Sequence, residues 1–122
     1  MSLKNRRQNF RVDLLLSVPQ KVTILGMKDT RVRLNDISLS GCQLAVHTRN
    51  YDMFNLNENL DILVNLFNLE DCKLRGKIRV IRKNTTKNLV LLGLEFVKPG
   101  PDALQDLQNA IFKIERLSRF KD

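Results

Sequence analysis

Two clusters of polar side chains in this chain of 122 residues have the chemistry to bind a nucleotide. The first runs from Arg6 to Arg11 and is rich in arginine. The second runs from Asn35 to Gly41 and contains a carboxylate, Asp36, and two serine hydroxyls. A guanidinium group forms planar, charge-assisted hydrogen bonds with a phosphate, and a carboxylate accepts two hydrogen bonds in one plane. Together, the two clusters therefore offer partners for a phosphate and for the donor edge of a purine.

Each cluster also has a purely structural interpretation. Asp and Ser side chains commonly cap the backbone of the turn in which they lie. Glycine adopts turn dihedrals that are closed to other residues, or lets the backbone lie flush against a neighbour. A run of Arg, Gln and Asn without an apolar stripe is typical of a solvated basic tail. The residues by themselves leave these alternatives open.

The order and spacing of the two clusters resemble the signature of the PilZ domain, a bacterial receptor for cyclic di-GMP. Arg7-x-x-x-Arg11 is similar to the RxxxR motif of that family. Asp36-x-Ser38-x-x-Gly41 is similar to its [D/N]xSxxG motif, and neither motif has a gap here. The resemblance extends over nearly the whole chain, which makes the pair of motifs more specific than either motif alone.

The resemblance implies roles for the basic cluster. Arg7 and Arg11 would grip the phosphates and guanine surfaces of cyclic di-GMP. In this family, an arginine directly before the first motif arginine goes with the binding of a stacked pair of ligand molecules, and Arg6 occupies that position here. The resemblance therefore implies two ligand molecules per chain.

The same resemblance implies roles for the second cluster and a fold. Asp36 and Ser38 would read guanine edges, and Gly41 would allow a close approach of the ligand. The implied fold is mainly β, a six-stranded antiparallel barrel with a C-terminal α-helix. The segment 93–96, Gly-Leu-Glu-Phe, resembles the end of the last barrel strand of the family.

Composition limits the remaining possibilities. The length fits one domain, and 43% hydrophobic residues are enough for a modest core. No apolar run approaches the length of a membrane span, and no leader peptide is recognisable, so we expect a soluble, cytoplasmic protein. Lys and Arg outnumber Asp and Glu by 21 to 13, which favours an anionic partner.

The sequence offers no set of residues for catalysis or for a metal. His47 is the only histidine, and no paired cysteines stand at metal-ligand spacing. Cys42 and Cys72 alternate in phase with apolar neighbours, so we expect both to be buried and free. Neither a nucleophile with an adjacent base nor paired carboxylates can be assembled. We therefore predict a protein that is not an enzyme and that binds no metal.

Hydrophobic periodicity predicts the elements that position the clusters. Residues 1–13 form a basic arm with little structure of its own, and residues 14–122 form the barrel and helix. Strands are predicted over residues 17–25, 31–34, 42–47, 60–66, 72–80 and 89–97. A helix is predicted over residues 102–119, with Asp102 as its N-cap and Gln105 completing a capping box. The segment 35–41 is then the corner between two paired strands.

The pattern also predicts individual core positions. Val80 completes the buried face of the strand over residues 72–80, and Gly93 marks a bulge or a close contact. The loop over residues 48–59 is held by apolar side chains, namely Tyr51, Met53, Phe54 and Leu56. The helix buries an apolar stripe, namely Leu104, Leu107, Ile111, Ile114 and Leu117.

Three functions are compatible with these observations. The first is a cyclic di-GMP sensor whose N-terminal arm changes conformation on binding and signals to a partner protein or a linked output domain. The second is a basic barrel that binds single-stranded nucleic acid. That function needs exposed aromatic platforms, and the chain has no Trp and one Tyr. The third is a PilZ-like adaptor that uses protein contacts without a ligand.

Overall fold

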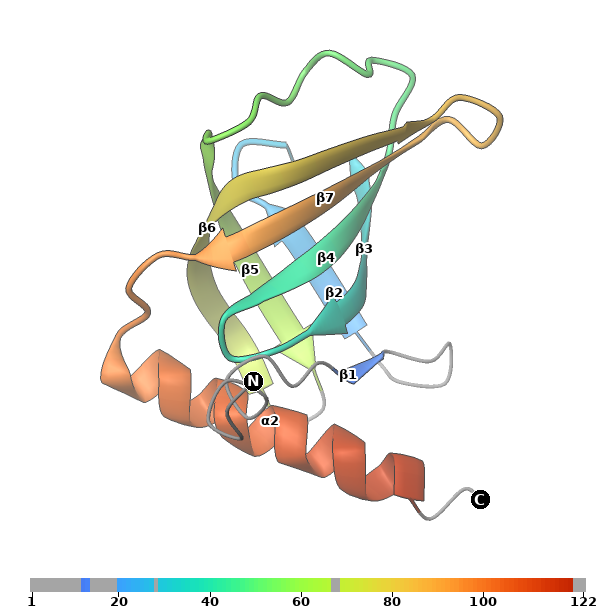
Figure 1. Ribbon diagram of the computed structural model, residues 1–122. Helices are drawn as coiled ribbons and strands as arrows, with labels where there is room; N and C mark the ends of the chain where they lie inside the picture. The colour runs from blue at the N-terminus through green and yellow to red at the C-terminus, as the bar shows by residue number, and fades with distance from the viewer. Residues whose placement is uncertain (1–11, 14–19, 28, 67–68, 120–122) are drawn as a thin grey trace, which may run out of the picture.

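The structure, a computed structural model, describes residues 12–13, 20–27, 29–66 and 69–119. These residues form one seven-stranded antiparallel sheet with the order β1-β3-β4-β7-β6-β5-β2, followed by one helix (Figure 1). The elements are β1 (Val12–Asp13), β2 (Gln20–Ile24), β3 (Arg31–Ile37), β4 (Gly41–His47), β5 (Asn59–Leu66), β6 (Leu69–Asn84), β7 (Leu89–Phe96) and α2 (Pro101–Arg119).

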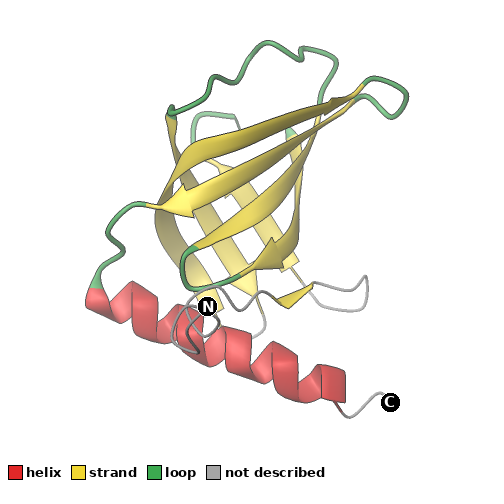
Figure 2. Cartoon of the chain, viewed as in Figure 1, coloured by secondary structure: helices red, strands yellow, loops and turns green. Residues whose placement is uncertain are grey.

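The sheet coils until β2 comes to lie beside β3, which makes a nearly closed barrel (Figure 2). Strands β2 and β3 lie side by side at the seam without a backbone ladder between them. The side chain of Gln20 bridges the seam instead. Its amide nitrogen donates to the carbonyl oxygen of Leu34 at 3.0 Å, and the Leu34 N–H donates to its amide oxygen at 2.8 Å. The predicted six-stranded barrel with a C-terminal helix is confirmed, and β1 adds a two-residue strand at the edge.

Buried and exposed residues alternate along the strands, and the buried residues form one core inside the barrel. Every second residue of β5 is buried, as the sequence pattern predicts, and the inward residues of β4 and β7 meet them. Helix α2 lies across one end of the barrel and contacts β6 and β1 (Figure 1). It covers that end with Leu107, Ala110, Ile111 and Ile114. None of the described residues belongs to a helix that is long and apolar enough to span a membrane.

The prediction for Val80 is wrong. Strand β6 is longer than predicted, and a bulge shifts its register between Ile78 and Val80. Because a bulge moves all following side chains to the opposite face, Val80 is 45% exposed and Ile81 is partly buried in its place. The irregularity lies opposite Gly93, so the bulge predicted at this glycine is confirmed.

The predicted start of the helix is also wrong. The helix begins at Pro101, and the N–H of Leu104 donates to the carbonyl oxygen of Gly100 at 2.9 Å, so Gly100 is the N-cap. Proline is favoured at the first helical position because its missing N–H has no partner there in any case. Asp102 lies in the first turn, and the side-chain amide of Gln105 donates to Asn109 and does not complete a capping box.

Two predicted apolar contacts are not made. Leu56 is 60% exposed, and its loop is held by Phe54, with Tyr51 and Met53 packed at the edge of the core. Leu104 is 38% exposed because it lies at the margin of the buried helix face, whereas Leu107 is fully buried. The side chain of Leu117 is outside the described part of the structure.

Candidate functional site

The corner between β3 and β4 is tighter than the sequence predicts. Strand β3 continues to Ile37, with a register shift between Leu34 and Asp36, and β4 begins at Gly41. The turn is closed by the N–H of Ser38, which donates to the carbonyl oxygen of Gly41 at 2.8 Å. Asp36 therefore lies on a strand and not in a loop, and a rigid element positions it.

Ser38 is fully buried and its hydroxyl organises this turn. The backbone N–H groups of Ser40 and Gly41 both donate to Ser38 Oγ at 3.2 Å. The same oxygen lies 3.1 Å from the hydroxyl of Ser40 and 3.2 Å from the carbonyl oxygen of Gly41. These are the bonds of a serine that caps its own turn. The direct guanine contact implied for Ser38 stays a prediction, and this geometry gives the residue a second role in shaping the corner.

Gly41 is required by the packing of two strands. A Cβ atom at this position would lie 2.1 Å from the carbonyl oxygen of Leu94 on β7. Among the described glycines, positive φ occurs at Gly26, so special dihedrals do not explain Gly41. The backbone of β4 lies flush against β7 here, and the N–H of Phe96 donates to the carbonyl oxygen of Ser40 at 2.8 Å. The glycine thus fixes the corner to the sheet.

Asp36 is half-buried between polar neighbours on both adjacent strands. It is paired with Gln43 on β4 and with Asp13 on β1. Next to it, the side-chain amide of Asn35 donates to the amide oxygen of Gln43 at 3.1 Å. Gln43 is not among the predicted site residues, and its alternation with the buried residues Cys42 and Leu44 is the signal in the sequence that places it on the outer face.

The structure does not describe Arg6, Arg7 and Arg11, which lie in residues 1–11. It does describe where their segment enters the sheet. Val12, the residue after Arg11, pairs with Ile37, and Ile37 directly precedes Ser38. The chain that carries the arginine motif therefore joins the sheet beside the serine corner. Of the predicted arm over residues 1–13, these last two residues are the described part.

The described residues contain no cluster of three or more His, Cys, Asp or Glu side chains that could hold a metal ion. Cys42 and Cys72 are buried thiols, as predicted, and are not linked to each other by a disulfide. Burial raises the pKa of the Cys72 thiol, and the nearby charge of Asp106 raises it further. A protonated thiol is a poor nucleophile and a poor metal ligand, so Cys72 acts as a core side chain.

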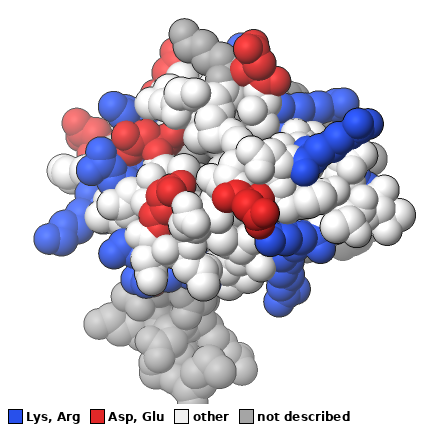
Figure 3. All heavy atoms as spheres, turned by 90° about the horizontal axis from the view of Figure 1, so that it is seen from above, with Lys and Arg blue, Asp and Glu red and all other residues white. Residues whose placement is uncertain are grey.

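Charged residues of both signs share the end of the barrel away from α2. In the view onto that end, Asp and Glu side chains lie among Lys and Arg (Figure 3). Ion pairs in this part of the structure include Lys83 with Asp52 at 2.9 Å. The net charge of +8 is therefore not concentrated at this end.

Comparison with known proteins places this arrangement in a family. The chain matches the family model of the PilZ domain over residues 5–113. It is similar in structure to the PilZ domain of YcgR from Escherichia coli with c-di-GMP, with a TM-score of 0.74 and 24% identity, over 95% of this chain and 96% of that chain. It is also similar to the Bacillus subtilis inhibitor of motility (MotI/DgrA), with a TM-score of 0.69 and 21% identity, over 93% of this chain.

At these identities, the two structures establish the fold, and the chain spans 52% of the length of the Bacillus protein. A search of curated proteins found no match. The family match covers both sequence motifs and the barrel that joins them. The chain therefore belongs to the PilZ domain family, whose members are non-enzymatic cyclic di-GMP receptors or adaptors.

Proposed function

We propose that this protein is a cyclic di-GMP receptor whose ligand binds between the N-terminal arginine motif and the corner from Asp36 to Gly41. The observation that carries the proposal is the pairing of β1 with β3, which joins the arginine segment to the sheet beside the corner. Family membership and the structural likeness to a PilZ domain with c-di-GMP support the choice of ligand. A net charge of +8 favours an anionic ligand of this kind.

The two halves of the proposed site act differently. Arg7 and Arg11 supply charge-assisted, bidentate hydrogen bonds to phosphate and guanine groups. Asp36 accepts hydrogen bonds from a guanine edge, while Ser38 and Gly41 hold the strand backbone that presents it. Arg6 adds a positive charge that offsets the repulsion between two stacked ligand molecules. Cyclic di-GMP is the ligand in this proposal, and no metal or catalytic cofactor takes part.

Removing either motif arginine should weaken binding strongly. Arg7→Ala and Arg11→Ala should each lose about 1.5–3 kcal/mol of binding free energy, the usual contribution of a hydrogen bond to a charged group, or about 10- to 150-fold in affinity. Isothermal titration calorimetry with cyclic di-GMP measures this directly. It should also give two ligands per chain, falling toward one in Arg6→Leu. Unchanged affinity in both alanine variants, with the fold intact by circular dichroism, would remove the arginines from the site.

Asp36 should determine which base is accepted. Asp36→Asn keeps the size of the side chain but replaces an acceptor by an amide that presents a donor, so the preference for cyclic di-GMP over cyclic di-AMP should fall about tenfold or more. Titration with both dinucleotides gives the ratio of the two affinities. Asp52→Asn, on the exposed loop after β4, is the matched charge control. An unaltered ratio in Asp36→Asn would reduce Asp36 to a structural residue.

Signalling in this proposal comes from ordering of the arm over the barrel. Ordering six to eight residues costs roughly 1–2 kcal/mol each in backbone entropy, so we expect affinity on the order of micromolar. Amide hydrogens of residues 4–11 should gain protection from exchange when cyclic di-GMP binds. Residues 60–66 and 72–80, within β5 and β6, should change little. Full protection of the arm before ligand is added would refute the switch without refuting binding.

A further inference from the structure

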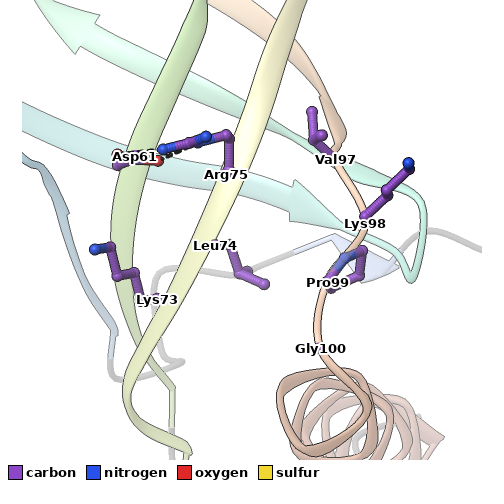
Figure 4. A pocket seen from close by; sticks show the side chains of 8 residues that line it. All are labelled: Asp61, Lys73, Leu74, Arg75, Val97, Lys98, Pro99 and Gly100. Carbon is purple, nitrogen blue, oxygen red and sulfur yellow. Dashed lines mark hydrogen bonds and ion pairs between the residues drawn. The ribbon is translucent and has the colours of Figure 1, made fainter.

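A cleft of about 400 Å³ lies between β6 and the linker that joins β7 to α2 (Figure 4). Its apolar lining comes from Leu74 on β6 and from Val97 and Pro99 in the linker. Leu74 is buried in the core, whereas Val97 and Pro99 remain partly exposed. The apolar surface that the cleft offers to a ligand is therefore small and comes mainly from Val97 and Pro99.

Three cations and one carboxylate line the same cleft. Arg75 donates to the carboxylate of Asp61 at 2.8 Å and 3.3 Å, and this hydrogen bond holds the pKa of Asp61 below its ordinary value. The carboxylate is therefore ionised and already neutralised by Arg75. The side chains of Lys73 and Lys98 make no hydrogen bond or ion pair with other residues that the structure describes, and both residues are exposed, although the charge of Lys73 also helps to lower the pKa of Asp61. The cleft consequently has an excess of positive charge.

The backbone of the linker after β7 turns away from the sheet and carries Lys98 with it. The N–H of Val97 donates to the carbonyl oxygen of Arg75 at 2.8 Å, and after this bond the linker leaves β6. Lys98 then has a φ of 37°, a conformation that non-glycine residues seldom adopt. In Figure 4 the side chain of Lys98 points away from the linker into the open, while Leu74 points toward Pro99. Lys98 thus borders the apolar surface on the linker side, while the side chain of Lys73 extends from β6 toward β5 (Figure 4).

We propose that this cleft docks an acidic segment of a partner protein. Aspartate or glutamate carboxylates of the segment pair with Lys73 and Lys98, and an apolar side chain between them packs on Val97 and Pro99. The volume of about 400 Å³ lies near the lower end of the range of ligand pockets, about 300–1,000 Å³, and accommodates one or two side chains. A segment carrying both charge and an apolar residue matches the lining on both counts.

The docking site is independent of cyclic di-GMP but adjoins the proposed ligand corner. The last residue of β7, Phe96, donates its N–H to the carbonyl oxygen of Ser40, and the next residue, Val97, lines the cleft. A partner bound here would therefore lie next to the end of β7 that is hydrogen-bonded to the corner. Peptide binding is measured without cyclic di-GMP, so its outcome does not depend on whether the protein binds cyclic di-GMP.

The probe is a capped peptide, acetyl-Glu-Glu-Leu-Glu-Glu-amide, titrated into the ¹⁵N-labelled protein at low salt. Backbone amide signals of residues 73–75, 97, 98 and 100 should shift and saturate. The neutral peptide acetyl-Gln-Gln-Leu-Gln-Gln-amide should bind at least tenfold more weakly. Shifts that appear elsewhere on the barrel, or equal binding of the two peptides, would overturn the proposal.

Variants separate local recognition from net charge. Lys73→Gln/Lys98→Gln should weaken binding of the acidic peptide at least tenfold. The control, Arg49→Gln/Lys87→Gln, removes the same charge from exposed loops outside the cleft and should bind nearly as the parent protein does. Equal loss in the two double variants would overturn the proposal. An oligothymidylate of eight nucleotides is the third probe. If it shifts the same amide signals at a lower concentration than the acidic peptide does, the cleft binds nucleic acid and the proposal is overturned.

Discussion

Gly41→Ala should be among the most destabilising single substitutions in the barrel. The added methyl group would start 2.1 Å from the carbonyl oxygen of Leu94, a distance that no pair of non-bonded atoms tolerates. Because the obstacle is backbone in the neighbouring strand and not the end of a side chain, β4 and β7 would have to separate. Overpacking of a core typically costs 1–3 kcal/mol, and we expect a loss of about 3 kcal/mol in the free energy of unfolding.

Urea denaturation of Gly41→Ala beside Gly93→Ala gives the measurement and its matched control. Both glycines lie within paired strands, but a Cβ at Gly93 would meet the Cβ of Val80 at 3.1 Å, so a shift of a few tenths of an ångström relieves the contact. Gly93→Ala should therefore change stability by no more than about 1 kcal/mol, since the loss of chain entropy in the unfolded state partly offsets the contact. Similar midpoints for both variants would show that the corner adapts.

The affinity of the Gly41→Ala variant for cyclic di-GMP should also fall, at temperatures where the variant remains folded. The turn bond from Ser38 to the Gly41 carbonyl and the bond from Phe96 to Ser40 both depend on the close approach of β4 to β7. A shift there moves the strand that carries Asp36. If the destabilised Gly41→Ala protein binds cyclic di-GMP with the affinity of the parent protein, Gly41 is needed for folding and not for binding.

Gln20→Ala should open the seam of the barrel. Removing the side-chain amide leaves both the N–H and the carbonyl oxygen of Leu34 without the partners they have in the folded protein, at a fully buried residue. A buried polar group without a partner costs about 1–3 kcal/mol, so we expect a loss of roughly 2–4 kcal/mol unless water enters the seam. Thermal or urea unfolding measures the loss.

Gln20→Glu tests the same contact with a side chain of nearly equal size. At neutral pH, the carboxylate can accept from the Leu34 N–H but cannot donate to the Leu34 carbonyl oxygen, so part of the stability should be lost. At acid pH the protonated carboxyl regains a donor. The deficit relative to the parent protein should therefore shrink as pH falls. A deficit that does not vary with pH would mean that the seam is held by packing and not by these two hydrogen bonds.

Much of the barrel was predictable because strand periodicity is local. The alternation of Leu60, Ile62, Val64 and Leu66 placed β5 correctly, and the same pattern placed β4 and the buried Cys42. Adjacent strands must bury the same face, so one correct phase constrains the next. The family signature was also visible, because its two motifs are short and contiguous in the sequence.

The error at Val80 arose because a distant strand decided the outcome. Val80 follows the alternation of β6 in the sequence, but a bulge against β7 turns it outward. The local residue pattern does not reveal such a register shift.

The error at the N-cap has a local cause. Asp102 has the chemistry of an N-cap, but Pro101, the residue before it, is favoured at the first helical position and starts the helix earlier. The proline was therefore a signal in the sequence that outweighed the aspartate.

Residue types and their spacing along the chain were enough to predict the barrel class, the core faces and the two polar clusters. The fold was needed to show where the segment after the arginine cluster joins the sheet, beside the corner from Asp36 to Gly41. The pairing of Val12 with Ile37, the contact of Gly41 with Leu94 and the bridge from Gln20 to Leu34 join residues that are far apart in sequence. Such contacts depend on how the whole sheet twists and closes, and no local pattern encodes that closure.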